Sequence, residues 1–159
     1  DPATTTAGAQ FEYNGPNTNL SPNLVLYRAL SGDRNLDGKW DATGISDSCL
    51  DLDGNALASP PAGPTRSYMN FTAGMLSRDS NGNVTALLDP FGYPYGYSTA
   101  FQGDVATGVN PPTHGYNPPY DLWSTGGNVV QAGDSAAQIA VKRAQWITNW
   151  QNSGANIGQ

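Results

Sequence analysis

Cysteine and histidine are nearly missing from this sequence. Cys49 is the only cysteine, which excludes an internal disulfide and any metal site built from several thiolates. His114 is the only histidine, and a Ser-His-Asp hydrolase would depend on it, yet no Gly-x-Ser-x-Gly nucleophile turn accompanies it. Neither a phosphate-binding P-loop nor a dinucleotide-binding fingerprint occurs. We therefore predict a protein without catalytic activity.

Basic residues and long apolar runs are also scarce. Lys and Arg number 7 against 13 Asp and Glu, which gives a formal net charge of −6. Nucleic-acid binding needs a clustered basic footprint, so we expect no nucleic-acid partner, and an anionic membrane surface is disfavoured for the same reason. No apolar run approaches the ~20 residues of a membrane-spanning helix. Glu12 is the only Glu, and because Asp favours turns, the acidic residues are expected mainly in loops.

Glycine and proline are abundant instead. The 159 residues include 19 Gly and 12 Pro, which predicts extensive loops, and the length predicts one domain spanning 1–159. Residues 1–19 are expected to be irregular, and residues 33–65 to form a long variable loop rich in Asp, Gly and Pro. Eight Tyr and four Trp are expected to supply much of the buried surface.

The sequence pattern predicts a mixture of short helices and strands. Ser21 and Pro22 are typical of a helix start, and Gly32 follows the apolar stripe that they open. Asn81-Gly82 between two apolar runs indicates a hairpin. Asp134 and Ser135 are suited to cap a last helix, after which Trp146, Ile147 and Trp150 pack the chain end onto the domain. The predicted elements are helix 22–31, hairpin strands 75–78 and 84–88, strands 91–101 and 120–125 joined by loop 102–119, and a helix from 135 to about 144.

The segment from Asp33 to Asp41 has the spacing of a calcium-binding loop. It reads D-x-N-x-D-G-x-x-D, with oxygen ligands at the first, third, fifth and ninth positions and a turn-forming glycine at the sixth. Position twelve, where such loops carry a bidentate Glu, is Gly44, and Asp47 is a candidate for the missing ligand. The alternative is a run of Asx turns without metal. The candidate calcium ligands are Asp33, Asn35, Asp37 and Asp41.

A row of aromatic residues occupies alternate positions from Phe91 to Tyr97. In an extended strand, four rings at period two leave the same face. Such a face is usually core or a subunit interface, which we expect here. The alternative is a platform on which sugar rings stack, as in a secreted carbohydrate-binding module.

Three segments in the second half of the chain resemble the C-terminal β-region of the major pseudopilin of bacterial type II secretion and of related type IV pilin-like proteins. Residues 88–95 resemble the family's Asp-Pro-Trp-Gly-x-Pro-Tyr, with Phe91 in place of Trp. Residues 120–127 resemble Tyr-Asp-x-x-Ser-x-Gly-Ala, and residues 146–150 resemble a closing Asp-Ile-x-Asn-Trp. The three segments occur in the family's order and cover about residues 88–150.

The resemblance implies a fold and a function. It implies an α+β pilin-like domain with a short N-terminal helix, a small antiparallel sheet and long loops, and without the family's hydrophobic anchor helix, which is not in this sequence. It implies a non-catalytic filament subunit whose partners are other pseudopilins and the secretion machinery, located as the periplasmic domain of an inner-membrane-anchored or filament-assembled bacterial protein. It also implies a calcium site, for which this chain offers Asn128 and Asp134. No other cofactor is expected.

Overall fold

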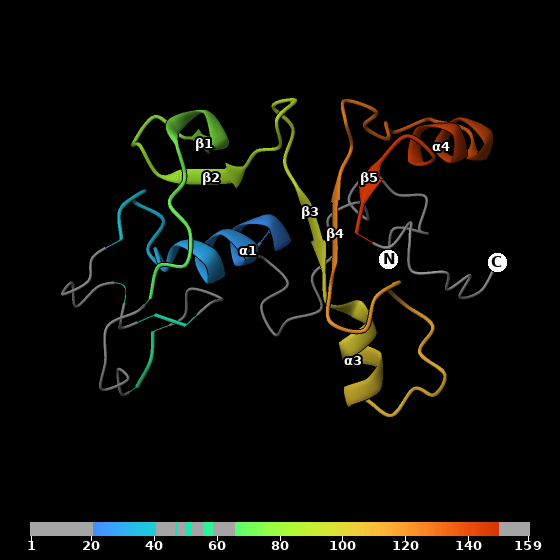
Figure 1. Cartoon of the computed structure of the whole chain (residues 1–159), viewed down its shortest axis with the longest axis horizontal. Helices are drawn as coiled ribbons and strands as arrows, with labels where there is room; N and C mark the ends of the chain where they lie inside the picture. The colour runs from blue at the N-terminus through green and yellow to red at the C-terminus, as the bar shows by residue number, and fades with distance from the viewer. Residues whose placement is uncertain (1–20, 41–46, 48–49, 52–55, 59–65, 150–159) are drawn as a thin grey trace. The chain divides into compact units, whose positions relative to one another are not determined.

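The computed structural model describes residues 21–40, 47, 50–51, 56–58 and 66–149 (Figure 1). These residues belong to two compact units: an N-terminal unit that extends to Leu88 and a C-terminal unit that begins at Asp89. Each unit combines helix with short antiparallel strands, which confirms the predicted α+β class. Within the described part of the chain, no helix has the length and apolarity needed to span a bilayer. The single domain and the likeness to pilins stay predictions.

Helix α1 (Pro22–Ser31) opens the N-terminal unit and has the predicted bounds. Pro22 suits the first helical position because its missing N–H needs no partner there. Gly32 ends the helix with φ +77, and its N–H donates to the Arg28 carbonyl at 3.0 Å. The predicted capping bond from the Ser21 side chain is not formed; the Ser21 main-chain carbonyl accepts from the Leu24 amide at 2.9 Å instead.

A hairpin follows the 3₁₀ turn η2 (Ala73–Met75). Its strands are β1 (Leu76–Arg78) and β2 (Val84–Leu87), with Leu76 opposite Leu87, as the Asn-Gly signal predicts. Helix α1 packs on β2 through Asn23, whose side-chain amide donates to the Leu87 carbonyl at 2.8 Å and whose oxygen accepts from the Leu87 N–H. Asn23 thus completes the main-chain pairing of Leu87. The buried apolar residues of this unit are Val25, Tyr27, Leu76, Val84 and Leu87.

The C-terminal unit contains a three-stranded antiparallel sheet in the order β3-β4-β5. Its elements are β3 (Gly96–Ser98), α3 (Ala100–Ala106), β4 (Asp121–Ser124), α4 (Ala136–Arg143) and β5 (Ile147–Thr148). The predicted strand over 91–101 is wrong at both ends, because residues 90–93 form a turn and α3 begins at Ala100. The last helix and its cap are confirmed: Ser135 and Gln138 form a capping box.

Two stacked tryptophans form the centre of the C-terminal core. The rings of Trp123 and Trp146 lie 6.2 Å apart at an interplanar angle of 8°, with Val130 and Ile139 buried beside them. Gly96 lies opposite Trp123 in the β3–β4 pair, and a Cβ added to Gly96 would meet the indole at 1.9 Å. Only glycine therefore fits at that position. Trp150, predicted to pack here as well, lies outside the described residues.

Candidate functional site

The loop after α1 carries the candidate calcium ligands, and its first turn is built around Asp33. Asp33 Oδ2 accepts from the Tyr27 hydroxyl and from the Gly38 N–H, both at 2.8 Å. Gly38 has φ +85, the left-handed conformation that glycine adopts without strain. The carboxylate therefore reaches across the loop and closes it.

The second oxygen of Asp33 has no partner. The Asp33 residue is 0% exposed, and its Oδ1 is buried without a hydrogen bond. Burial is the main cause that raises the pKa of Asp33, and the nearby Asp47 carboxylate raises it further, whereas the hydrogen bonds from Tyr27 and Gly38 lower it. Asp33 is thus a buried acid whose ionised form is only half satisfied.

The next two candidate ligands form Asx turns. Asn35 Oδ1 accepts from the Asp37 N–H at 3.0 Å, and Asp37 Oδ1 accepts from the Lys39 N–H at 2.9 Å. Asp47, also 0% exposed, joins the same loop, because its Oδ1 accepts from the amides of Arg34 and Asn35 at 2.9 and 3.1 Å. The side chains of Asp33, Asn35, Asp37 and Asp47 thus all accept main-chain N–H groups of the loop 33–40.

Asp41 lies outside the described residues. Among the residues that are described, no three His, Cys, Asp or Glu side chains gather as a metal-binding group. Two ligands of a calcium loop of this pattern would not belong to such a group, because they are an Asn amide oxygen and a main-chain oxygen. The calcium loop therefore stays a prediction here.

The loop before α4 holds the other predicted metal ligands, and Lys142 of α4 binds it with its ammonium group. Lys142 Nζ donates to Asp134 Oδ2 at 2.6 Å and to the Val129 carbonyl at 3.0 Å. The Gln131 N–H also donates to that Asp134 oxygen at 2.6 Å, and this bond, followed by Lys142, lowers the pKa of Asp134. Asn128 contributes its main-chain carbonyl, which accepts from Trp146 Nε1 at 2.9 Å. These residues fit a loop closed by lysine better than one closed by calcium.

The three segments that carry the pilin-like resemblance meet in the C-terminal unit. Asp89, from the first segment, accepts from the Ser124 hydroxyl of the second, and also from the amides of Phe91 and Tyr93 at 2.9 Å each. Asn149, from the third segment, accepts from the Leu122 N–H at 2.9 Å and donates to the Tyr120 carbonyl at 3.1 Å. The polar residues of these motifs hold the strands of the sheet.

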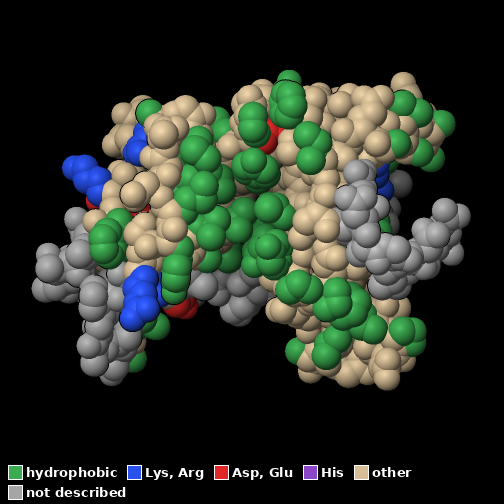
Figure 2. Space-filling model, viewed as in Figure 1, with side chains coloured by type: hydrophobic (Ala, Val, Ile, Leu, Met, Phe, Trp, Pro, Cys, Tyr) green, Lys and Arg blue, Asp and Glu red, His purple; other side chains and the backbone are tan. Residues whose placement is uncertain are grey.

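The aromatic row does not form one face, because its first half is a turn in which the Phe91 and Tyr93 amides donate to Asp89. Phe91 and Tyr93 are exposed to 56% and 39%, whereas Tyr97 is half-buried and packs against Tyr120 at 6.2 Å between ring centroids. An open apolar groove of about 350 Å³ lies beside the turn. Its lining includes Phe91, Tyr95, Leu122, Trp123 and Ile147. Figure 2 shows wide hydrophobic areas on the face drawn and few charged side chains among them.

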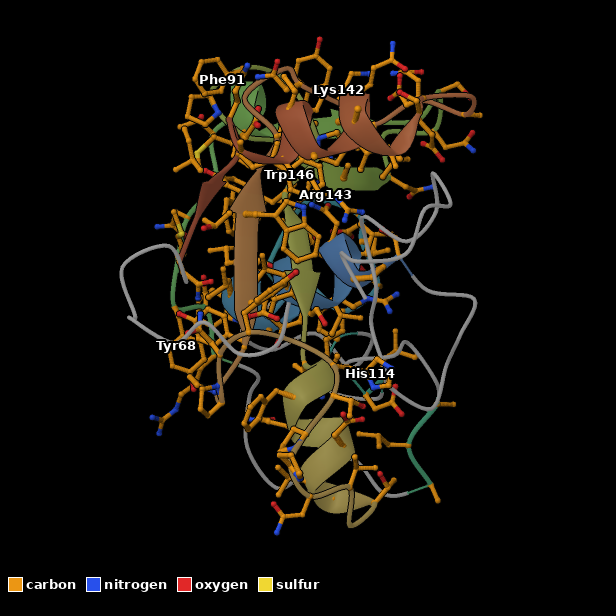
Figure 3. The ribbon with its side chains drawn as sticks, turned by 90° about the vertical axis from the view of Figure 1, so that its right-hand side faces the viewer. Tyr68, Phe91, His114, Lys142, Arg143 and Trp146 are labelled. Carbon is orange, nitrogen blue, oxygen red and sulfur yellow. The ribbon has the colours of Figure 1, made fainter. Side chains whose placement is uncertain are left out.

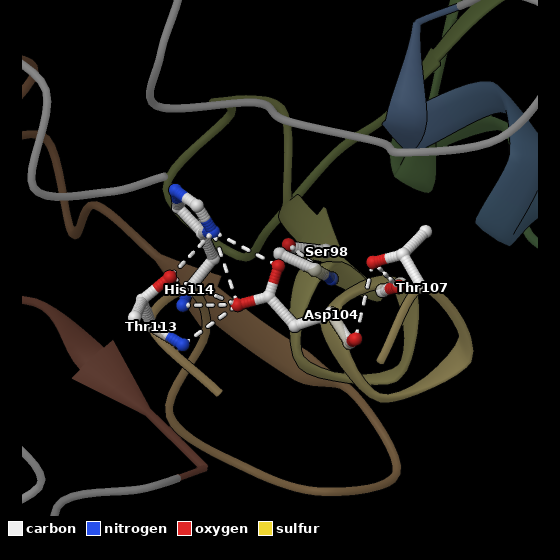
Figure 4. Close-up of polar contacts among 7 residues, drawn as sticks. Ser98, Asp104, Thr107, Thr113 and His114 are labelled. Atoms are coloured by element: carbon white, nitrogen blue, oxygen red, sulfur yellow. Dashed lines mark hydrogen bonds and ion pairs between the residues drawn. The ribbon is translucent and has the colours of Figure 1, made fainter. Parts of the chain in front are cut away.

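The lone histidine is held by an aspartate of α3. Asp104 accepts from His114 Nδ1 at 3.0 Å, from the His114 amide at 2.9 Å and from the Thr113 amide at 2.7 Å (Figure 4). The side-chain bond from His114 is the main cause that lowers the pKa of Asp104 to about 2. Ser98, buried near the start of α3, accepts from the Ala100 amide. This arrangement fixes loop 107–114 and presents no activated serine.

Sequence reasoning missed two of these arrangements. The first is the binding of Lys142, on α4, to the loop before that helix. Figure 3 labels Lys142 on α4, and His114 beside α3. The signal for Lys142 was a basic residue in the last turn of a helix, which usually needs no further explanation. The pairing of Asp89 with Ser124 spans 35 positions and has no local signal.

Comparisons with protein-family models, curated proteins and solved structures found no match to this chain.

Proposed function

We propose that this chain is a structural subunit of a type II secretion pseudopilus or of a related type IV pilus-like filament. The observation that carries the proposal is that the second and third motif segments pair in one sheet and that the first segment, which leads into β3, is bonded to it. Asp89 binds Ser124 across two of them, and Asn149 joins the third to β4. These side chains hold the strands together, which suits a structural subunit of a filament.

The exposed apolar residues of the C-terminal unit suit contacts between subunits. Phe91 and Ile147 are exposed to 56% and 59% and line the same groove. A filament requires head-to-tail contacts that do not close into a ring, so each subunit must present an apolar patch to a neighbour. We propose other pseudopilins and the secretion machinery as partners, and the periplasm as the location.

The test is incorporation of the natural full-length gene product into filaments. Cells that carry the gene and its secretion or pilus genes are sheared, and the filament fraction is probed for this chain. Phe91→Ser and Ile147→Ser should reduce incorporation by about tenfold or more, because apolar anchors dominate such contacts. Val105→Ser is the matched control, since Val105 is equally exposed, at 57%, but lies on α3 away from the groove. Near-UV circular dichroism checks that all three variants fold.

Absence of the chain from filaments, or equal incorporation of all three variants, would contradict the proposal. The alternative is a secreted carbohydrate-binding module, which the aromatic lining of the groove by Phe91 and Tyr95 favours. Retention on insoluble polysaccharide that Tyr95→Ala abolishes would support the alternative. Tyr68→Ala serves as its control, because Tyr68 is exposed but lies in the N-terminal unit.

A further inference from the structure

We propose that the loop of residues 33–40 binds a calcium ion, with Asp33 Oδ1 as its first ligand. The starting observation is that oxygen itself: it is buried in a residue that is 0% exposed and has no hydrogen bond of normal geometry, although the Leu36 amide also acts on the carboxylate. Burying a carboxylate oxygen without a partner destabilises the fold, because the charge loses its hydration and no hydrogen bond replaces it. A cation is the partner that satisfies it best.

The geometry of the carboxylate presents Oδ1 to the loop. Asp33 Oδ2 takes the N–H of Gly38, five residues on, so the carboxylate lies inside the turn that Gly38 closes at φ +85. Calcium loops use an oxygen ligand at position one and a sharply turned glycine at position six. Oδ2 of Asp33 thus closes the turn, and Oδ1 is the oxygen that we assign to the ion.

Asn35 and Asp37 offer two further candidate ligands in the same loop. Asn35 Oδ1 and Asp37 Oδ1 each accept one main-chain N–H, at 3.0 and 2.9 Å. An amide or carboxylate oxygen has a second lone pair, so these bonds leave each oxygen able to coordinate. The Lys39 carbonyl stands at position seven, where calcium loops use main-chain oxygen.

Charge favours a cation over water at Asp33. Within the described part of the chain, neither Asp33 nor Asp37 forms an ion pair with lysine or arginine. The guanidinium of Arg78 donates to the main-chain carbonyls of Asp37 and Gly82, at 3.3 and 2.6 Å, and that of Arg34 donates to the Leu50 carbonyl. The Asp47 carboxylate adds negative charge near Asp33. Because position twelve is Gly44, we expect weak binding, with a Kd of about 10⁻⁴ to 10⁻³ M.

The test uses the chain alone and does not depend on filament assembly. Calcium at about ten times its Kd should raise Tm by about 3 °C or more, and EDTA should reverse the shift. Terbium, a luminescent substitute for calcium, should show emission excited through Trp40, at position eight of the loop, and calcium should displace it.

Three variants decide whether the response belongs to this loop. Asp33→Asn removes the charge of the buried ligand, and Asp37→Asn does so at an exposed residue where loss of folding is not a concern. Both should weaken calcium binding by about tenfold or more. Asp79→Asn is the control: Asp79 is an exposed Asx-turn aspartate of the same unit whose oxygens all have donors.

Three results would overturn the proposal. The first is a wild-type chain with no Tm shift and no displaceable terbium emission up to about 10 mM calcium, a concentration well above the weakest expected Kd. The second is equal affinity in Asp37→Asn and Asp79→Asn. The third is a calcium response that Asp134→Asn abolishes and Asp37→Asn leaves intact, which would place the ion at the loop before α4.

Discussion

Asp33 of the N-terminal unit and Asp89 of the C-terminal unit are both buried carboxylates, and the chain satisfies them to different degrees. In the C-terminal unit, Asp89 has three donors from the chain, and Asp134 has a lysine and an amide. In the N-terminal unit, Asp33 is fully buried and keeps one oxygen without a partner. A carboxylate whose oxygens all have donors from the chain gains little from a bound cation. A buried carboxylate with one oxygen lacking a partner is stabilised when a cation binds to that oxygen. The C-terminal unit should therefore be indifferent to calcium and the N-terminal unit responsive to it.

The largest effect is expected from Asp89→Ala. It removes three hydrogen bonds to a buried charge and disconnects the first motif from β4, so we expect a loss of about 3 kcal/mol or more in the free energy of unfolding of the C-terminal unit. Urea unfolding followed by the fluorescence of Trp123 and Trp146 measures it. Asp79→Ala removes two similar main-chain bonds, but at an exposed turn, and should cost much less. Equal losses in the two variants would contradict a structural role for the motif.

Tyr27→Phe should have a smaller effect, confined to the N-terminal unit. It removes the hydroxyl that donates to Asp33 Oδ2 and should cost about 1 kcal/mol without calcium. The same bond lowers the pKa of Asp33, so its loss should raise that pKa further. Carboxyl NMR titration measures the change. A fall in the pKa of Asp33 would show that the hydroxyl does not hold the ionised form.

Asp33 and Asp104 should respond to acid in opposite directions. The pKa of Asp33 is raised in the folded state, so the folded chain holds that proton more tightly, and acidification from neutral pH towards about 4 should remove the cost of its buried charge in the calcium-free chain. The pKa of Asp104 is lowered to about 2, so its contribution to stability is present above about 4 and is lost as the pH falls towards 2. Carboxyl NMR titration of the two side chains measures both pKa values. A pKa of Asp33 as low as that of Asp104 would contradict the comparison.

Lys142→Met should give the most local effect. Without the ammonium group, the bonds to Asp134 and to the Val129 carbonyl are lost, so the amides of the loop before α4 should exchange faster, and the pKa of Asp134 should move back towards its ordinary value. Lys142→Arg keeps the charge and should retain part of the protection. An unchanged Asp134 pKa in Lys142→Met would show that the lysine is a bystander.

Local chemistry made the helices and the first hairpin predictable. Pro22 and Gly32 bound α1, Asn81-Gly82 marks the turn between β1 and β2, and Ser135 caps α4. Each signal acts within a few residues, so the sequence alone carries it. The turns after Asp33 were predictable for the same reason, since the spacing of Asn35, Asp37 and Gly38 is typical both of a calcium loop and of a run of Asx turns.

Side-chain interactions that the sequence pattern does not indicate decided the rest. Asp89 bends residues 90–93 into a turn, although the alternating rings read as a strand, because a buried carboxylate with two amide donors outweighs a weak strand preference. Ala100 begins a helix where a strand continuing to residue 101 was expected. The ion pair between Lys142 and Asp134 depends on α4 folding back over its own N-terminal loop, which no spacing rule encodes.

The most direct test of the comparison between the two units is a calcium titration of the ¹⁵N-labelled chain followed by amide chemical shifts. Progressive shifts at residues 33–40 and at Asp47, together with unchanged amides at residues 125–135, are the predicted result. Shifts at residues 125–135 with a silent Asp33 loop, or no shifts in either loop, would contradict it.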